Sequence, residues 1–221
     1  WQGLRVGVVF AHDKAKRIAA QVLEASVDDI ELQDGLFHVR GVPQNGLTLA
    51  DIADKAYSGD IGDIEPGLET TNFFKPSDET FPFGSHVAVV EVFPETGEIQ
   101  LLDVFTADDC GVIISPMLVE GQVHGGLAQG IGQALVEEMY YDSNGELMTG
   151  TLADYAVPRF TLFPTFTTDH TETKTPLNPL GAKGIGEAAT IGATPVTANA
   201  VIDALEPWGI THVDIALTPE R

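Results

Sequence analysis

VEGQVHGGLAQGIGQALVEE, which runs from Val119 to Glu138, is the stretch that decides how this chain folds. Its apolar residues recur at every fourth position, a spacing that places side chains on one face of an α-helix. These residues are Val119, Val123, Leu127, Ile131 and Leu135. The pattern predicts a helix that begins at about Pro116 and buries this apolar row.

The same stretch is rich in glycine. Its five glycines are Gly121, Gly125, Gly126, Gly130 and Gly132. Each one costs roughly 0.8–1 kcal/mol of helix stability relative to alanine, or about 4–5 kcal/mol together. Close packing must offset that cost, so either another backbone or a ligand lies against the glycines. Gln122 and Gln129 stand beside them, and their amide groups suit a polar heterocycle or a phosphate.

A second glycine-rich stretch, NPLGAKGIGE, runs from Asn178 to Glu187. Glycine permits positive φ angles and a close approach of the backbone to another group, so we expect such a group to lie against this loop. Glu187 leads directly into a helix-like segment, and a carboxylate on a rigid turn suits a general base. A glutamate at this position also stabilises an ordinary helix N-terminus by roughly 0.3–1 kcal/mol. The loop by itself leaves both interpretations open.

The remaining pattern predicts an α+β fold. Two apolar segments, 86–93 and 99–107, flank a turn and should form antiparallel strands. Residues 30–39 alternate in polarity around Asp34-Gly35, which indicates a hairpin. We expect mixed or antiparallel sheets with packed helices in two subdomains, residues 1–83 and residues 84–221. The first would be scaffold that ends in a long loop.

Local signals predict several further elements. Thr48 should cap a short helix that ends at about Tyr57. Thr194 and Pro195 have the residue types of a helix N-cap and first helical position. The other expected elements are a strand over 6–10, an amphipathic helix over 11–25, a final helix over 196–205 and an edge strand over 210–217.

The composition limits the partners that the chain can bind. Thirty-three acidic residues against 11 basic ones give a formal net charge of −22, which repels nucleic acid and anionic membranes. The single cysteine, Cys110, excludes an intrachain disulfide and suits a cytoplasmic protein. Asp108 and Asp109 precede it, but the histidines are scattered, so we expect no metal site made of protein ligands.

Two further features concern the extent of the chain. No apolar run reaches the roughly 18–20 residues that span a bilayer. The chain opens at Trp1 rather than at a methionine. We therefore expect it to be cut from a longer polypeptide.

Together these segments resemble the C-terminal part of the molybdenum-binding large subunit of the xanthine dehydrogenase and aldehyde oxidase family. The resembling stretches also include DDCGVIISP (108–116) and TPLNPLGAKGIGEAATIGATPVTANAVIDAL (175–205). Within that family the chain resembles the branch of aerobic carbon monoxide dehydrogenase large subunits. Residues 84–221 would then be a molybdopterin-binding C-terminal subdomain.

The resemblance implies an oxidoreductase that hydroxylates a small substrate, such as carbon monoxide, an aldehyde or an N-heterocycle, with oxygen taken from water. It implies molybdenum held by molybdopterin in its cytosine dinucleotide form. The implied partners are the rest of the large subunit, an iron–sulfur small subunit and an FAD-containing medium subunit, in a dimer of heterotrimers.

The resemblance also assigns roles to residues. Glu187 would be the catalytic base, Gln122 would form a hydrogen bond with the pterin, and Lys183 would lie at the cofactor. The glycines that would let backbone close on the pterin and pyrophosphate are Gly121, Gly125, Gly126, Gly184 and Gly186. Other cofactor-binding segments of the family lie upstream and are absent, so the chain alone should retain little cofactor and show no activity. The alternative is a non-catalytic assembly module whose glycine-rich helix and acidic surface dock a partner subunit.

Overall fold

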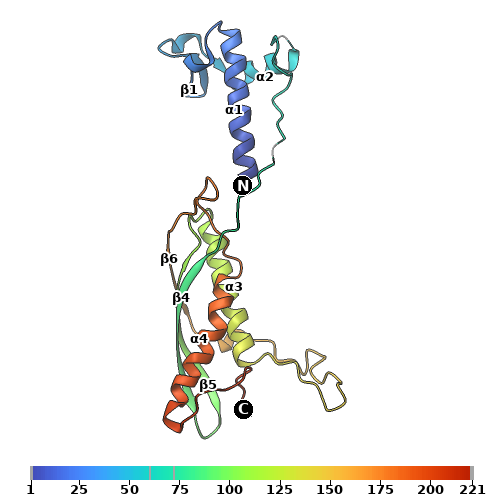
Figure 1. The fold of residues 1–221 in the computed structure, drawn as a ribbon, viewed down its shortest axis with the longest axis vertical. Helices are drawn as coiled ribbons and strands as arrows, with labels where there is room; N and C mark the ends of the chain where they lie inside the picture. Colours follow the sequence, from blue (N-terminus) through green and yellow to red (C-terminus); the bar gives the residue numbers. More distant parts are fainter. Residues whose placement is uncertain (1, 60, 72, 220–221) are drawn as a thin grey trace. The chain divides into compact units, whose positions relative to one another are not determined.

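The computed structural model describes residues 2–59, 61–71 and 73–219. The chain divides into two compact units, Trp1–Pro76 and Ser77–Arg221, both drawn in Figure 1. Each unit combines helices with a three-stranded sheet, so the expected α+β class is confirmed. Within the described residues every helix is too short or too polar to cross a bilayer.

The first unit contains two helices and a small antiparallel sheet. The helices are α1 (Gln2–Val22) and α2 (Leu49–Ser58), and the strands, in the order β1-β2-β3, are Ile30–Gln33, Leu36–Val39 and Leu47–Thr48. Short 3-10 turns cover Val27–Asp29 and Pro43–Asn45. Buried apolar side chains from α1, α2, the strands and the turn after α2 form the core of this unit, including Ile18, Ile30, Phe37, Ile52 and Ile61.

Local signals in this unit are confirmed. Gln33 pairs with Leu36, so Asp34 and Gly35 form a two-residue turn, and both have the positive φ (51° and 80°) that such hairpin turns require. Thr48 caps α2 in a reciprocal arrangement: its hydroxyl accepts from the Asp51 amide at 3.2 Å, and the Thr48 amide donates to the Asp51 carboxylate at 2.8 Å.

The strand expected over residues 6–10 is wrong, because α1 already runs through them from Gln2. An extended segment needs a neighbouring strand for its hydrogen bonds, and none of the described strands pairs with it. A helix makes its bonds internally and extends from a segment that has already formed. The helix predicted after Ala11 therefore continues towards the N-terminus, although Val8, Val9 and Phe10 remain exposed.

The second unit is a sheet covered by two helices. The sheet has the order β4-β5-β6, with β4 (Phe83–Phe93) antiparallel to β5 (Glu98–Asp109) and β6 (Phe166–Thr171) parallel to β5. The long helices are α3 (Pro116–Leu135) and α4 (Ala188–Leu205), and 3-10 turns cover Phe160–Leu162 and Glu206–Trp208. Strands β4 and β5 confirm the strands expected over 86–93 and 99–107, and α3 confirms the helix expected from about Pro116.

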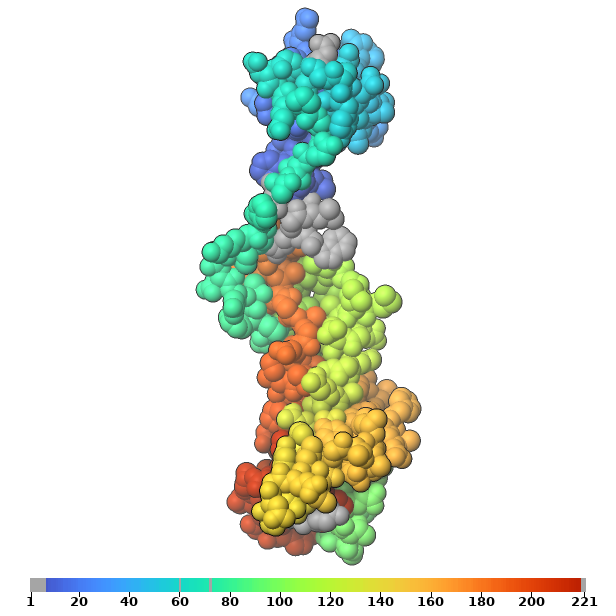
Figure 2. Space-filling model, turned by 90° about the vertical axis from the view of Figure 1, so that its right-hand side faces the viewer, coloured from blue at the N-terminus to red at the C-terminus, as the bar shows by residue number. Residues whose placement is uncertain are grey.

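Helices α3 and α4 lie side by side, and α4 also packs on β4. Figure 2 shows them as neighbouring yellow-green and orange columns. Apolar side chains of β5, α3 and α4 form the common core, including Val104, Leu127, Ile131, Ala193 and Val201. The apolar row of the glycine-rich helix is therefore buried as predicted.

The N-terminus of the last helix differs from the prediction. Helix α4 begins at Ala188 and holds Pro195 in its interior. A proline inside a helix costs about 3 kcal/mol, but the turns before it pack tightly on α3. Thr194, the expected N-cap, instead donates its hydroxyl to the Gly130 carbonyl of α3 at 3.1 Å. Tertiary packing on α3 thus overrides the local signal.

The expected edge strand over 210–217 is also wrong, since none of the described strands includes these residues. Ala216 and Leu217 are buried, and the Leu217 amide donates to the Ala134 carbonyl near the end of α3 at 2.8 Å. The tail is therefore anchored to a helix end, whose last carbonyls are open to such bonds.

The glycines of α3 serve two different faces. A Cβ on Gly126 or Gly130 would meet α4 at short distance, 2.9 Å and 2.6 Å from the Cβ atoms of Ala189 and Ala193. A Cβ on Gly121 or Gly125 would meet nothing within 4 Å. A second backbone thus explains Gly126 and Gly130, and it does not explain Gly121 and Gly125. The expectation that Gly126 lies against a cofactor is wrong, because it is buried against α4.

We expect Gly130→Ala to destabilise the second unit by about 1–3 kcal/mol, the usual cost of overpacking, because its methyl group would also lie 2.9 Å from the Thr190 carbonyl. Gly125→Ala is the matched control and should stabilise the helix by up to about 1 kcal/mol. Chemical denaturation of both variants measures the difference. Equal stabilities would contradict the observed packing.

Candidate functional site

The loop before α4 is shaped by Asn178. Its side-chain oxygen accepts hydrogen bonds from the Leu180 and Ala182 amides at 3.1 and 3.3 Å, and its Nδ2 donates to the Ala182 carbonyl at 2.8 Å. Gly181 takes a φ of 70° within this turn, a conformation that costs glycine little. The first half of the loop is therefore fixed.

Backbone contacts join this loop to the end of β5. Gly111 and Ala182 form an antiparallel bridge, the Lys183 amide donates to the Cys110 carbonyl at 2.7 Å, and the Val112 amide donates to the Gly181 carbonyl at 3.1 Å. A side chain on Gly111 would collide with the Gly181 carbonyl. The two segments thus approach at backbone distance.

A buried ion pair adds to this connection. The Lys183 Nζ lies 2.9 Å from Asp109 Oδ1, and the two side chains are 7% and 0% exposed. Asp109 also accepts from the Gly111 amide at 2.9 Å and from the Thr171 hydroxyl at 3.0 Å. Burial alone would raise the pKa of the Asp109 carboxyl, but the bonds from the Gly111 amide and from Lys183 outweigh it, so that pKa lies well below its ordinary value.

Asp108, the neighbour of Asp109, forms a second buried cluster. Its Oδ1 lies 3.2 Å from His86 Nε2, and its other oxygen accepts from the Thr106 hydroxyl. Burial would raise the pKa of Asp108, but these bonds hold it below its ordinary value. The His86 ring lies where the side chain of any larger residue at position 192 of α4 would stand. The cluster is therefore packed directly against that helix.

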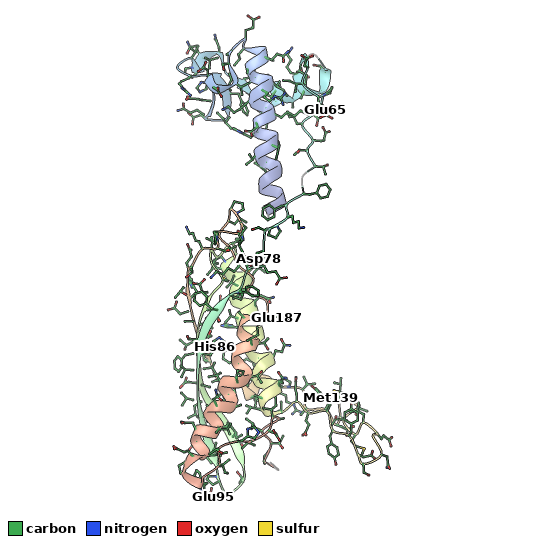
Figure 3. All side chains as sticks on the ribbon, viewed as in Figure 1. Glu65, Asp78, His86, Glu95, Met139 and Glu187 are labelled. Atoms are coloured by element: carbon green, nitrogen blue, oxygen red, sulfur yellow. The ribbon has the colours of Figure 1, made fainter. Side chains whose placement is uncertain are left out.

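The second half of the loop is open. Gly184, Gly186 and Glu187 are exposed, and a Cβ on Gly184 would meet nothing within 4 Å. Glu187 is the N-cap residue of α4, but its side chain forms no capping hydrogen bond. Its carboxylate is therefore available to an external group, and Figure 3 labels it at the start of this helix.

Helix α3 reaches the same place. Gly121, Gln122 and Gly125 are exposed, and the Gln122 Oε1 atom lies 3.6 Å from the position that a Cβ on Gly186 would take. The structure thus brings together residues that are far apart in the sequence. We call this surface the open glycine face; it consists of Gly121, Gln122, Gly125, Gly184, Gly186 and Glu187.

The open glycine face suits a flat polar ligand. Exposed glycine backbone on two neighbouring elements allows a ring or a pyrophosphate to approach without a side chain in between. The Gln122 amide can donate to the ligand and accept from it. The residues therefore fit a pterin cofactor, whose edge is polar and whose faces are flat.

Lys183 was also predicted to lie at the cofactor, but unlike the residues of the open glycine face its side chain is buried and paired. Its ammonium group is paired with Asp109 and lies 4.5 Å from the centroid of the Phe83 ring. Sequence reasoning missed this pair, although the two acids at the end of an apolar strand were a signal. Within the described residues no cluster of three or more His, Cys, Asp or Glu side chains is arranged to hold a metal ion.

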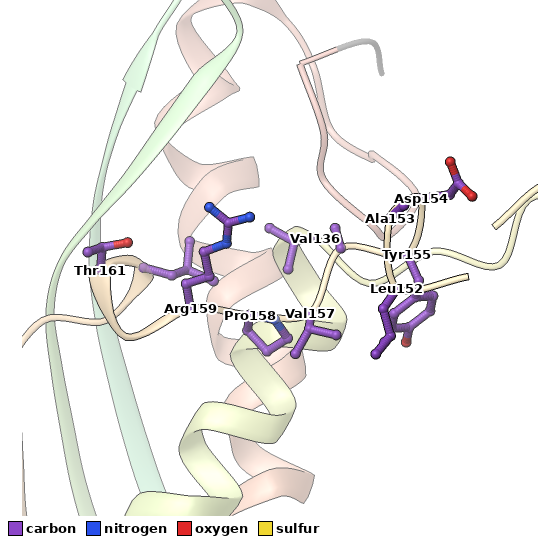
Figure 4. Close-up of a pocket in the computed structure, with 11 residues that line it drawn as sticks. Val136, Leu152, Ala153, Asp154, Tyr155, Val157, Pro158, Arg159 and Thr161 are labelled. Carbon is purple, nitrogen blue, oxygen red and sulfur yellow. The ribbon is translucent and has the colours of Figure 1, made fainter. Parts of the chain in front are cut away.

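One cavity of the second unit is separate from this face, and another adjoins it. The cavity in Figure 4 has a volume of about 570 Å³ and is lined by Val136 at the end of α3 and by residues between 152 and 162. It contains none of the predicted site residues. A smaller cavity of about 270 Å³ lies beside the loop and includes Cys110, Val119 and Ile185. Burial raises the pKa of the Cys110 thiol.

Comparisons with known proteins show the family of the chain. Residues 8–164 match the family described as "Molybdopterin cofactor-binding domain"; the matched range includes the α3 part of the open glycine face and ends before the loop. The carbon monoxide dehydrogenase large chain of Hydrogenophaga pseudoflava is 40% identical over 210 residues, which cover 95% of this chain and 26% of that protein. The nicotine 6-hydroxylase large subunit of Paenarthrobacter nicotinovorans is 40% identical over 211 residues, with 94% and 26% covered.

A solved structure is similar over almost the whole chain. Quinoline 2-oxidoreductase from Pseudomonas putida 86 superposes with a TM-score of 0.85 at 41% identity, and the match covers 96% of this chain and 27% of that one. The chain thus spans about a quarter of the length of the relatives that it matches. It belongs to the family of molybdopterin cofactor-binding domains, as its glycine-rich stretches predicted.

Proposed function

We propose that this chain is the C-terminal part of a molybdenum hydroxylase large subunit and supplies one side of the cofactor site together with the catalytic base. The open glycine face carries this proposal: among the described residues, nothing lies within 4 Å of a Cβ built on Gly121, Gly125 or Gly184, so packing inside the unit does not explain these exposed glycines. The relatives include a carbon monoxide dehydrogenase, a nicotine hydroxylase and a quinoline oxidoreductase. The substrate class is accordingly a small molecule such as carbon monoxide, an aldehyde or an N-heterocycle.

The residues of the face have distinct tasks. Gln122 forms hydrogen bonds with the cofactor, and the glycines at positions 121, 125, 184 and 186 let it approach the backbone. Glu187 takes a proton from the water molecule whose oxygen is transferred to the substrate carbon. When bound, the molybdenum of the molybdopterin cofactor would supply the two-electron oxidation that this hydroxylation requires. A direct contact between Lys183 and the cofactor stays a prediction, since its Nζ atom is bound to Asp109.

The proposal also covers the form of the cofactor, the partner subunits and the cellular compartment. We infer the cytosine dinucleotide form of the cofactor, and iron–sulfur and FAD groups on partner subunits that carry the electrons away. We also infer a dimer of heterotrimers in the cytoplasm. The names of the relatives support a large subunit within a complex.

We expect Gly125→Leu, made in the complete enzyme, to reduce bound molybdopterin at least about tenfold, because the side chain would fill the space where the ligand approaches. Its thermal stability should not fall, since a Cβ there meets nothing within 4 Å. Molybdenum and pterin content per protein chain are the measurements. Gly126→Ala is the matched control: it alters the adjacent position on the packed side, and it should lower stability rather than cofactor content.

Unchanged cofactor content in Gly125→Leu would contradict the proposal. If the same variant instead weakened the binding of a partner subunit, the chain would be a non-catalytic assembly module, and its exposed Leu118 and Ile191 would be the apolar contacts of that interface.

A further inference from the structure

The Asp109–Lys183 ion pair is assigned no step of the proposed reaction, yet both of its side chains are almost fully buried. Its members come from separate elements, the end of β5 and the loop before α4. The Phe83 ring, 4.5 Å from the ammonium, adds a contact from β4. Three elements therefore meet at Lys183.

Stability alone does not explain such a pair. Desolvation of two charges cancels most of their attraction, and apolar replacements of similar volume are often as stable or more stable. What an ion pair with further hydrogen bonds does provide is a defined geometry. Asp109 is itself a residue of β5, and its carboxylate accepts hydrogen bonds from Lys183, Gly111 and Thr171. It therefore fixes these three residues relative to the strand.

Lys183 lies four residues before Glu187, in the loop that leads into α4. Lys183 is the last residue of the loop that the described bonds join to the end of β5, and the exposed Gly184 and Gly186 follow. Ile185 between them packs on the core of the unit. Glu187 is then the N-cap residue of α4, which packs on α3. The segment that carries Glu187 is thus held at Lys183, at Ile185 and at the first turn of α4.

We propose that Asp109 is a positioning residue: through its ion pair with Lys183 it fixes the segment Gly184–Glu187 against Gln122, and so sets where the Glu187 carboxylate stands. This inference rests on the proposed role of Glu187 as base. Without the counter-charge of Asp109, the ammonium of Lys183 gains by moving into water, and the loop moves with it. A displacement of about 1 Å at a reacting group can cost on the order of 10² in rate.

The test uses Asp109→Asn in the complete enzyme. Asparagine keeps the size of the side chain and, through its Oδ1, the bond from the Gly111 amide. It removes the charge and replaces Oδ2, which accepts from the Thr171 hydroxyl, with an NH2 group that can donate to that hydroxyl instead. We expect kcat to fall by about 10- to 100-fold while KM and the molybdenum content stay within about twofold. Hydrogen exchange at the bonded amides that flank this segment, those of Ala182, Lys183 and Ala188, should rise by at least about tenfold, while exchange in α3 stays unchanged.

Two further variants keep the test decisive. Asp109→Asn with Lys183→Met leaves no unpaired charge and should fold even if a single variant does not; it should still show faster exchange in the loop and a lowered kcat. Glu172→Gln removes an exposed pair with Lys174, 3.5 Å apart, and should change neither measurement.

Several results would overturn the positioning role. One is a double variant that regains the original kcat, since packing alone would then suffice. Another is a loss of cofactor in Lys183→Met but not in Asp109→Asn, which would make Lys183 a cofactor ligand. A rise in exchange over all of the second unit would show a merely structural pair. Glu187→Gln is measured in parallel: if it retains turnover, the base assignment fails, whereas loop exchange still reports whether Asp109 holds the segment.

Discussion

Replacement of Glu187 by glutamine should lower kcat of the complete enzyme by about 10²–10⁴, the usual contribution of a general base. Glutamine has the size and shape of glutamate but cannot accept a proton at neutral pH. Because the side chain forms no capping bond in α4, the fold should not change. Molybdenum content should also be retained, so that kcat and kcat/KM fall together.

Asp203→Asn provides the matched control for Glu187→Gln. Asp203 is an exposed acid on the same helix, and its loss changes the net charge equally. We expect full activity from this variant. Turnover of Glu187→Gln within about tenfold of the original enzyme would show that another group accepts the proton.

Lys183→Met should have the largest effect on stability. It leaves the carboxylate of Asp109, whose side chain has no exposed surface, without its counter-charge. Removal of one partner from a buried pair costs 3–5 kcal/mol, and we expect about 3 kcal/mol because the bonds from Gly111 and Thr171 remain. Denaturant unfolding at pH 7 measures this loss.

The pH dependence of that loss has a definite sign. In the original protein the pKa of Asp109 is depressed, so its stabilising contribution is complete above the ordinary carboxyl pKa and is lost only in strong acid. Without the ammonium of Lys183 the pKa of Asp109 rises, and protonation relieves the buried charge at a higher pH. The two proteins should therefore approach equal stability as the pH falls below about 4. A difference that stays constant with pH would contradict a charge-based cause.

Local elements were predictable because their causes are local. The Asp34-Gly35 turn, the Thr48 cap and the apolar row of α3 each rest on residues a few positions apart, and each is confirmed. The start of α4 was not predictable from Thr194 and Pro195, because contacts with α3 decide it. The parallel pairing of β5 with β6 likewise depends on distant residues.

In the candidate site, too, local features were predictable and contacts between distant residues were not. The glycines of α3 could be recognised as costly, but their spacing alone does not tell which of them face α4 and which stay open. Only the packed structure separates Gly126 and Gly130 from Gly121 and Gly125. The partnership of Asp109 with Lys183 joins residues 74 positions apart, a distance at which sequence pattern carries no information about contact.

Pro195 lies inside α4 and interrupts its backbone hydrogen bonds. A proline has no N–H, so the hydrogen bond that would return to the Ile191 carbonyl cannot form, and the hydrogen-bond ladder of α4 is interrupted there. Helical order spreads through successive hydrogen bonds. The turns from Ala188 to Thr194 are held to α3 by the bond from Thr194 to Gly130, so the missing bond weakens the link between fraying at the C-terminal end of α4 and the turns beside Glu187.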